Sequence, residues 1–295
     1  APAGFSNSQK FTCTTPTGTL SASDNANINY KIEAQDLQQL DYGSSGAKSF
    51  TISFYVKSNK TGNASLEISQ KDPASVRSVL LQYNISAANT WEYKELTVAG
   101  DTAGQMDNDN GEGLQIVWWL RTGTDLTGGS HQTAWYTRVD ADRNVSNLDV
   151  GATANDYWQI TGVQLEVGEQ ATPFEHRSYA DTLIKCQRYY YNTYIAPQSS
   201  GSATNGLQAG TFNAGDRYVV DNFFPVDMRS QPTVVYYGGR SGSSNTADRV
   251  SIYNSDTVRS FVAEPSVTIK GLRGHFDTNN TDGAVRYHFT ANAEL

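Results

Sequence analysis

One stretch, residues 157–191, constrains the fold of this chain of 295 residues more than any other. In its first part, residues 157–167, side chains alternate with a period of two residues, which is the pattern of a β-strand. Its second part offers two helix starts. Thr172-Pro173-Phe174-Glu175 combines an N-cap residue, a proline at the first helical position and a glutamate that could close a capping box. Residues 178–181 offer a second start of the same kind.

From the second start, apolar side chains recur at spacings of four, three and four residues. They form one stripe of a short helix, which consists of Tyr179, Leu183, Cys186 and Tyr190. The charged side chains at positions 181, 185 and 188 lie off this stripe. We therefore expect a helix over residues 178–190. The expected division of the chain is a β domain over residues 1–177, a linking helix over 178–191 and a smaller β domain over 192–295.

The residues before the helix contain short β-strands at regular spacing. Two of these strands have a clearly apolar face. The face of the first strand consists of Phe50, Ile52, Phe54 and Val56, and that of the second consists of Leu114, Ile116, Trp118 and Leu120. We expect both faces to point into one core. Further strands are expected at residues 9–14, 64–70, 78–85, 92–98, 133–139 and 157–167, a number that suits a two-sheet jelly roll.

The residues after the helix form a second series of candidate strands between Gly-, Ser- and Asn-rich turns. We expect these strands at residues 217–224, 233–237, 249–253, 260–263, 266–271 and 284–291. No internal repeat of fixed period occurs, which argues against a β-helix. The predicted fold class is therefore all-β, with a jelly-roll β-sandwich, a short linking helix and a second, smaller β-sandwich domain.

Charge and composition exclude several functional classes. Only 18% of the residues are charged, against about a quarter in typical domains, and the formal net charge is −8. Because nucleic acids are polyanions and no cluster of Lys or Arg offsets this charge, we expect no nucleic-acid partner. No apolar run has the length of a membrane span, so we expect no membrane insertion. Cys13 and Cys186 lack metal-type spacing; we interpret them as two buried thiols, with a disulfide as the alternative.

The sequence contains no recognisable catalytic motif, and we expect neither enzymatic activity nor a cofactor. The four histidines, at positions 131, 176, 275 and 288, are scattered. A pair of carboxylates for glycoside hydrolysis is the open alternative, because such a pair comes together only in the fold. The cluster at residues 107–112 has oxygen ligands suited to Ca²⁺ but not the spacing of an EF-hand loop. We interpret it as an Asx-rich turn and expect no metal ion.

Residues 158–191 resemble a motif that recurs in fibre and other virion proteins of tailed bacteriophages. In that motif a strand of the form W-x-I-T-G-V-Q-L-E-x-G is followed by A-T-P-F-E-H-R and then by C-Q-R-Y-Y. The resemblance extends upstream through residues 30–33, 53–62 and 88–92, so that it covers roughly residues 10–191. Downstream it rests on residues 224–234 and on the last three residues, 293–295.

The resemblance implies a virion fibre protein with a jelly roll like that of carbohydrate-binding modules. The implied partners are further copies of the chain in a homotrimer, other virion proteins and polysaccharide on the host surface. The implied location is the virion, outside the cell after release. Because the chain begins at Ala1 and the resembling proteins usually continue upstream, we expect it to be the distal part of a longer polypeptide. Many carbohydrate-binding jelly rolls use an acidic pair in the last strand to hold calcium; this chain has Thr161-Gly162 there, which argues against that metal site.

We expect a ligand to bind on the sheet face opposite the core. The candidate residues on that face are Tyr55, Lys57, Trp119 and Arg121, with Trp135 or Tyr136 as a neighbour. Flat aromatic rings stack on the C–H faces of sugar rings, and adjacent polar groups then orient the hydroxyls. Tyr55 also matches the aromatic residue of the S-F-W-x-K strand in carbohydrate-binding modules. The alternative is that these aromatic side chains are buried under loops, against the second domain or in a subunit contact.

The function that we expect is that of a non-enzymatic virion fibre that recognises glycan on the host surface. One alternative is a purely structural or decorating fibre without a ligand. Another is the sugar-binding region of a secreted polysaccharide-degrading enzyme. The helical stripe of Tyr179, Leu183, Cys186 and Tyr190 either meets its copies at a three-fold axis or packs on the jelly roll.

Overall fold

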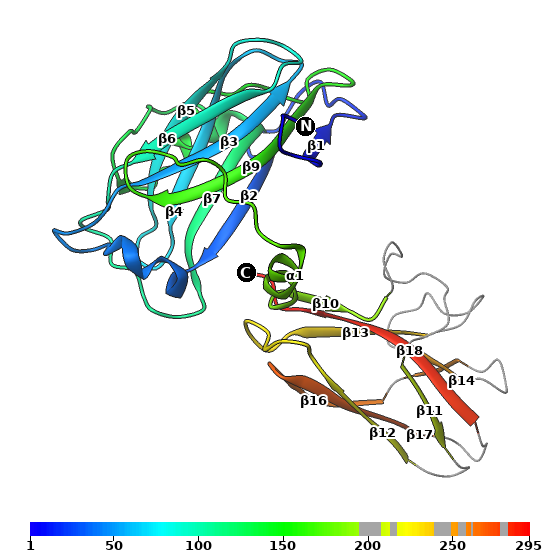
Figure 1. Cartoon of the computed structure of the whole chain (residues 1–295). Helices are drawn as coiled ribbons and strands as arrows, with labels where there is room; N and C mark the ends of the chain where they lie inside the picture. The colour runs from blue at the N-terminus through cyan, green and yellow to red at the C-terminus, as the bar shows by residue number, and fades with distance from the viewer. Residues whose placement is uncertain (195–207, 213–216, 239–248, 253–257, 261, 278–282) are drawn as a thin grey trace. The chain divides into compact units, whose positions relative to one another are not determined.

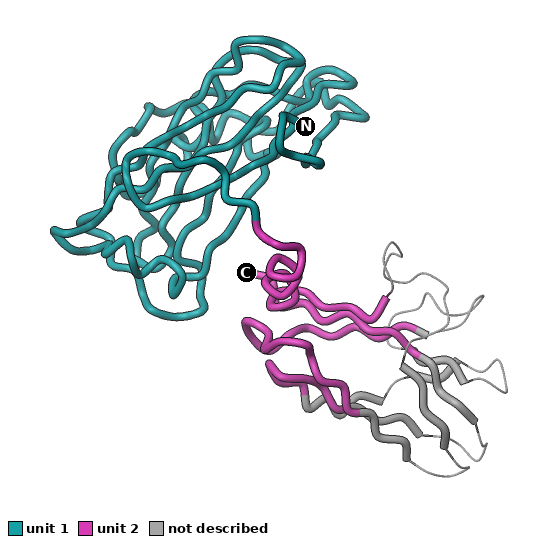
Figure 2. The backbone as a smooth tube through the Cα atoms, in the orientation of Figure 1, with its two compact units in different colours: residues 1–176 teal, residues 177–295 magenta. Residues whose placement is uncertain are grey.

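The computed structural model describes residues 1–194, 208–212, 217–238, 249–252, 258–260, 262–277 and 283–295. The chain divides into two compact units, Ala1–His176 and Arg177–Leu295 (Figure 2). The first unit is described without gaps. Within the described residues, no helix combines the length and the apolar character that crossing a bilayer requires. The fold is all-β, as predicted, with a jelly-roll sandwich, a short helix and a smaller second sandwich.

The first unit consists of two antiparallel sheets (Figure 1). Sheet A contains, in spatial order, β1 (Gln9–Thr12), β9 (Tyr157–Val167), β3 (Phe50–Ser58) and β6 (Glu92–Val98). Sheet B contains β2 (Asn25–Glu33), β7 (Glu112–Thr122), β4 (Gly62–Gln70), β5 (Arg77–Ile85) and the two-residue strand β8 (Tyr136–Thr137). Three short 3₁₀ helices occur in the connections, at Ala34–Leu40, Thr124–Leu126 and Asp140–Asp142. Because the chain repeatedly crosses between the sheets, this order gives a jelly roll.

The core of the first unit lies between the two sheets and contains the predicted apolar faces. The side chains of Phe50, Ile52, Phe54 and Val56 are fully buried, and those of Leu114, Ile116, Trp118 and Leu120 join them. The ring of Phe54 packs edge-on against that of Trp118, with centroids 5.9 Å apart. Trp158, also fully buried, donates its indole N–H to the Tyr83 hydroxyl at 3.1 Å, which satisfies a polar group that burial would otherwise leave unpaired.

The second unit contains two further antiparallel sheets. One has the order β10 (Tyr190–Asn192), β18 (Gly283–Asn292), β14 (Arg249–Ile252) and β15 (Val258–Ser260), and β11 (Gln208–Phe212) and β13 (Thr233–Gly238) also pair with β18. The other contains β12 (Arg217–Phe223), β17 (Gly271–Asp277) and β16 (Val262–Thr268). Its described core includes Phe224, Met228, Tyr236, Leu272 and Phe289. Residue 253, at the end of one predicted strand, and residue 261, inside another, lie outside the described residues.

The helix α1 spans Tyr179–Gln187 and starts at the second of the two predicted sites. The Ser178 hydroxyl accepts a hydrogen bond from the backbone N–H of Asp181 at 3.1 Å, which is an N-cap. The helix ends three residues earlier than predicted, because Tyr190 begins β10 and pairs with β18. No residue of α1 is buried, and Tyr179 and Leu183 are 81% and 40% exposed.

The two cysteines are free thiols, but they are not buried as expected. Cys13 is half-buried in the first unit, where its thiol lies 3.5 Å from the carbonyl oxygen of Gly151. Cys186 is exposed on α1. The sequence pattern placed Cys186 on an apolar stripe, and such a stripe is buried only where another surface covers it.

Candidate functional site

The expected single ligand-binding face does not exist. Tyr55 and Lys57 lie on β3 of sheet A, whereas Trp119 and Arg121 lie on β7 of sheet B. In a two-sheet sandwich the outer faces point in opposite directions, so these residues lie on opposite sides of the unit. The period of two correctly separated inward from outward side chains within β3 and β7, but not along the whole of β9, where the register shifts near Gly162 and puts Gln164 and Glu166 on the face opposite to Trp158 and Ile160. The period contains no information on which sheet a strand joins.

Trp119 is part of a second, small core and not of a binding surface. It is only 2% exposed and clusters with Val117 and Leu126, which belongs to the connection after β7. Its indole N–H donates to Glu67 Oε2 at 3.2 Å, and the Arg143 guanidinium lies 5.0 Å from the ring centroid. Arg143 also forms an ion pair with Glu67 at 3.0 Å. The chain between β7 and β9 therefore covers this part of sheet B.

Arg121 of sheet B and Trp135, which directly precedes β8, are also engaged within the fold. Arg121 donates from Nη1 to the carbonyls of Thr17 and Gly151 at 2.7 and 2.8 Å. Trp135 packs edge-on against Tyr42, with centroids 5.6 Å apart, and its indole N–H donates to the carbonyl of Ala99 at 2.7 Å. These contacts hold loops to the sandwich.

Tyr136 lies on the short edge strand β8, where it is paired with Ser78 of β5. Burial, together with the carboxylates of Asp142 and Glu67, raises the pKa of the Tyr136 hydroxyl to about 12. The hydroxyl is therefore neutral at physiological pH. Neither Trp135 nor Tyr136 belongs to the sheet that contains Tyr55.

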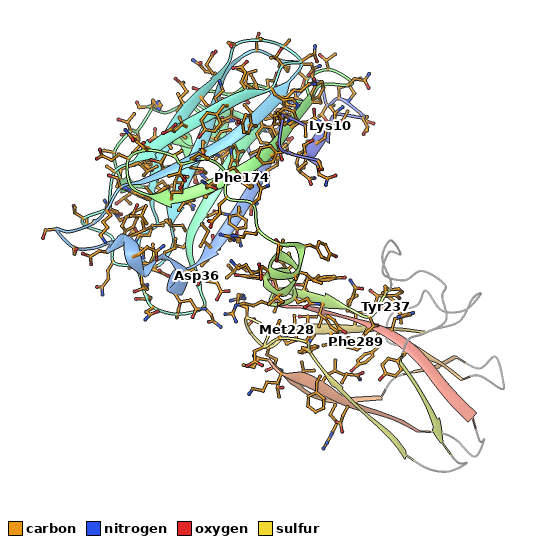
Figure 3. The ribbon with its side chains drawn as sticks, in the orientation of Figure 1. Lys10, Asp36, Phe174, Met228, Tyr237 and Phe289 are labelled. Carbon is orange, nitrogen blue, oxygen red and sulfur yellow. The ribbon has the colours of Figure 1, made fainter. Side chains whose placement is uncertain are left out.

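On the outer face of sheet A, the structure instead brings together a row of rings. We call this cluster the aromatic platform; it consists of Phe5, Tyr55, Tyr93, Phe174 and His176 (Figure 3 labels Phe174). Tyr93 of β6 lies directly opposite Tyr55 of β3, and their ring centroids are 5.2 Å apart. The ring centroid of Phe5 lies 5.5 Å from that of Tyr55 and 4.9 Å from that of Phe174. Tyr93 is 45% exposed and His176 is also exposed, so two rings of the platform are open to solvent.

Gly162 explains how the N-terminal segment reaches this face. Its φ is +61°, a left-handed conformation that favours glycine, and a Cβ there would lie 2.6 Å from the ring of Phe5. Thr161 adds a hydrogen bond from its hydroxyl to the carbonyl of Asn7 at 2.8 Å. The Thr161-Gly162 pair therefore serves to seat Phe5.

The residues between β9 and α1 form a strap across the same face. Gln164 and Glu166 of β9 accept hydrogen bonds from the backbone N–H groups of Glu175 and Thr172, at 2.8 and 2.9 Å. Glu95 of β6 accepts one from Ala171 at 2.8 Å. Hydrogen bonds from Thr172 and Gln164 lower the pKa of Glu166, which is therefore ionised at neutral pH. The strap (residues 171–176) thus adds Phe174 and His176 to the platform.

Sequence reasoning missed four of the five platform residues, namely Phe5, Tyr93, Phe174 and His176. One signal for the strap was available in the alternation of the motif around Leu165. There Gln164 and Glu166 occupy the outward positions of a strand, and polar side chains on an outer face are able to bind a passing backbone. Tyr93 is likewise an outward residue of its strand. Nothing in the sequence indicated that residues 1–8 return to this face.

The expected Asx turn is present at the acidic cluster. Asp109 Oδ1 accepts from the backbone N–H of Gly111 at 2.8 Å, and Glu112 lies 3.1 Å from Lys31 and 3.9 Å from Lys71. Burial, followed by the charges of the cluster, raises the pKa of the neighbouring Asp72 carboxyl. In the part of the chain that the structure describes, no three residues among His, Cys, Asp and Glu are grouped as a metal site would require.

Comparison with known proteins gives no family. No protein-family model matches the sequence, and neither does any curated protein. A solved structure titled "CBM4 structure and function" is 12% identical over 48% of this chain and 59% of its own, with a TM-score of 0.24. Wild-type discoidin II from Dictyostelium discoideum is 9% identical over 98% of this chain and 82% of its own, with a TM-score of 0.19. At these TM-scores, the assignment of the fold rests on the strand order and register of the chain itself.

Proposed function

We propose that this chain is a non-enzymatic fibre protein of a bacteriophage virion and that its jelly roll attaches to polysaccharide on the host surface. The sequence resemblance over roughly residues 10–191 supports the fibre assignment. The structure gives that motif a local role. Gly162, Gln164 and Glu166 of the motif hold Phe5 and the strap on sheet A.

The observation that carries the glycan proposal is the exposed ring of Tyr93 beside the half-buried ring of Tyr55 in the aromatic platform. The rings of Tyr55 and Tyr93 lie on paired strands with their centroids 5.2 Å apart, and Tyr93 is exposed. Such rings stack on the apolar C–H face of a pyranose with little loss of conformational entropy. Lys57 lies two residues beyond Tyr55 on the same face and adds donors for sugar hydroxyls.

Buried carboxylates of the first unit support a non-enzymatic role. Glu67 is paired with Arg143, Asp101 with Arg77 at 2.7 Å, and Asp156 lies 3.6 Å from Lys60. A general acid or base must be able to exchange a proton with a bound substrate. Carboxylates held in internal ion pairs serve the fold, and this agrees with a binding protein better than with a glycoside hydrolase.

We also propose that the chain forms a homotrimer in which the copies of α1 meet. The stripe of Tyr179, Leu183 and Cys186, with Tyr190 beyond the end of the helix, is exposed, and three copies about an axis would cover it. We expect light scattering to give about 97 kDa, three times the 32.2 kDa of the chain. Leu183→Asp should dissociate the trimer, whereas Lys185→Asp, which places the same carboxylate off the stripe, should not. A mass near 32 kDa for the unmutated protein at micromolar concentration would contradict the trimer.

A glycan array tests the attachment function. We expect the native protein to bind a defined subset of bacterial surface glycans and Tyr93→Ala to lose most of that signal. The matched control is Tyr30→Ala, because Tyr30 is also an exposed tyrosine but lies on β2 of sheet B. Absence of binding to every glycan would favour the purely structural fibre. Release of shorter sugars from a bound glycan would favour the region of a polysaccharide-degrading enzyme.

A further inference from the structure

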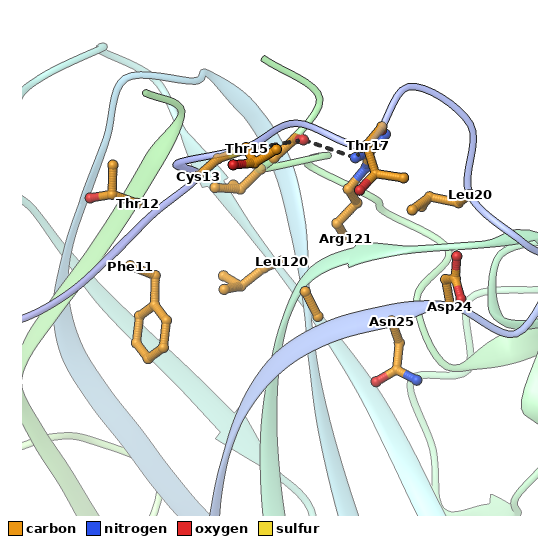
Figure 4. A pocket seen from close by; sticks show the side chains of 13 residues that line it. Phe11, Thr12, Cys13, Thr15, Thr17, Leu20, Asp24, Asn25, Leu120 and Arg121 are labelled. Atoms are coloured by element: carbon orange, nitrogen blue, oxygen red, sulfur yellow. Dashed lines mark hydrogen bonds between the residues drawn. The ribbon is translucent and has the colours of Figure 1, made fainter. Parts of the chain in front are cut away.

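A cavity of about 420 Å³ lies where the loop of residues 13–24 crosses from β1 of sheet A to β2 of sheet B (Figure 4). Its apolar wall includes Phe11, Leu120 and Val150. Thr15, Asp24 and Arg121 supply polar groups around it. The volume falls in the range of roughly 300–1,000 Å³ that is typical of small-molecule sites. The platform, by contrast, lies on the outer face of sheet A, and it shares no residue with this cavity.

The charged groups at the cavity are fixed in place and keep unused hydrogen-bonding capacity. Arg121 is held by the carbonyls of Thr17 and Gly151, and its Nε lies 2.7 Å from Asp149 Oδ1. Asp24 Oδ2 accepts from the backbone N–H of Ser21 at 2.8 Å. In the first unit, all of which is described, Arg121 Nη2 and Asp24 Oδ1 have no hydrogen-bond partner. A donor and an acceptor thus remain for a ligand.

The charge balance determines which ligands fit. Among the residues that line the cavity, one guanidinium, Arg121, stands against one carboxylate, Asp24, and Asp149 outside the lining pairs with Arg121, so the cavity has no net positive charge with which to attract an anion. A purely apolar ligand would leave the hydroxyls and the free carboxylate oxygen without partners, which costs binding energy. The ligand that satisfies both conditions is neutral, carries several hydroxyls and has one apolar face.

We infer that this cavity binds a single neutral hexopyranose unit, as a second sugar site separate from the aromatic platform. The C–H face of the pyranose would lie on the apolar wall formed by Phe11, Leu120 and Val150. Its hydroxyls would donate to Asp24 and accept from Arg121, since a hydroxyl is both a donor and an acceptor. The inference does not require the platform to bind glycan.

Saturation-transfer NMR with the full chain tests this site. The probes are the methyl α-pyranosides of glucose, galactose and mannose, with glucuronate as the anionic probe. We expect at least one neutral glycoside to receive saturation and glucuronate to receive none. Absence of transfer to all three neutral glycosides would overturn the inference, and so would equal transfer to glucuronate.

Substitutions of residues that line the cavity test whether the glycoside binds there. Ala26 lines the cavity and is exposed, so Ala26→Phe fills the space without removing a side-chain hydrogen bond, and we expect it to abolish the transfer. Ala22→Phe is the matched control, because Ala22 is exposed but does not line the cavity. Asp24→Asn, which keeps the shape, should weaken binding at least fivefold. Transfer that persists in both Ala26→Phe and Asp24→Asn would overturn the site.

A Tyr93→Ala variant separates this inference from the proposed attachment function. We expect Tyr93→Ala to keep the saturation of the neutral glycoside while losing the array signal. Loss of both signals in this variant would show that the platform is the only sugar site, which would contradict the cavity.

Discussion

Replacing Trp119 by alanine tests whether the outer face of sheet B is a covered second core. The Trp119 side chain is almost completely buried, and truncating a buried Trp costs roughly 3–5 kcal/mol through lost burial and the cavity left behind. The variant also loses the contact of the ring with Arg143, worth roughly 0.5–2 kcal/mol, and the hydrogen bond to Glu67. These losses overlap, so we expect the free energy of unfolding to fall by about 4 kcal/mol.

Tryptophan fluorescence measures this loss in the intact chain. All five tryptophans, at positions 91, 118, 119, 135 and 158, lie in the first unit, so the signal reports unfolding of that unit alone. With a urea m value in the range of roughly 1–3 kcal/mol per molar, a loss of about 4 kcal/mol lowers the midpoint by more than 1 M. Far-UV circular dichroism checks that the shift does not arise from the missing fluorophore.

Two further variants decide the interpretation. Trp119→Phe keeps most of the ring volume but removes the donor to Glu67, and we expect it to cost about 1–3 kcal/mol. Tyr93→Ala, on the open platform, should cost about 1 kcal/mol, mainly from its contact with Tyr55. A Trp119→Ala loss below about 1 kcal/mol, or one no larger than that of Tyr93→Ala, would refute the burial of Trp119.

Three other predictions address the contact between Gly162 and Phe5, the Glu92 carboxylate and metal binding. Gly162→Ala should lower the free energy of unfolding by about 1–3 kcal/mol, because of the positive φ and the close approach to Phe5. In urea titration, the Phe5→Ala/Gly162→Ala double variant should lose less unfolding free energy than the sum of the losses in the two single variants. Strict additivity of the two losses would contradict this contact. Burial raises the pKa of Glu92, but hydrogen bonds from Lys94 and from the backbone at residues 86 and 87 outweigh burial and lower the pKa. The stabilisation by Glu92 is therefore present above the unfolded pKa of about 4.3 and disappears as the pH falls through the folded pKa. Glu92→Gln should lower the melting temperature at pH 7 but not at pH 3, and an equal fall at both pH values would contradict this effect. EDTA should leave the melting temperature unchanged, and a fall of several degrees that Ca²⁺ reverses would show a bound metal.

The faces of β3 and β7 were predictable from the sequence, because a regular strand has a side-chain period of two. Phe54 and Trp118 were placed in the core on this basis, and both are buried there. The assignment of strands to sheets was not predictable in the same way, since pairing depends on contacts between distant segments. Tyr55 and Trp119 were therefore assigned to one face although they belong to opposite sheets.

The start of the helix shows the same limit of local information. The segments at Thr172 and Ser178 have equivalent capping patterns, and only the second begins a helix. At the first, Glu166 and Gln164 of β9 bind the backbone N–H groups and hold the chain extended on sheet A. Tertiary hydrogen bonds thus override a local propensity of a few tenths to about 1 kcal/mol.

The measurement that tests the central claim most directly is calorimetric titration of the strongest array glycan against the native chain, Tyr93→Ala and Trp119→Phe. If the platform on sheet A holds the glycan, Tyr93→Ala weakens the affinity about tenfold or more, which corresponds to about 1.4 kcal/mol. Trp119→Phe, which remains folded and lies on the other sheet, leaves the affinity unchanged. Unchanged affinity in Tyr93→Ala, with weakened affinity in Trp119→Phe, would place the ligand on sheet B and contradict the account.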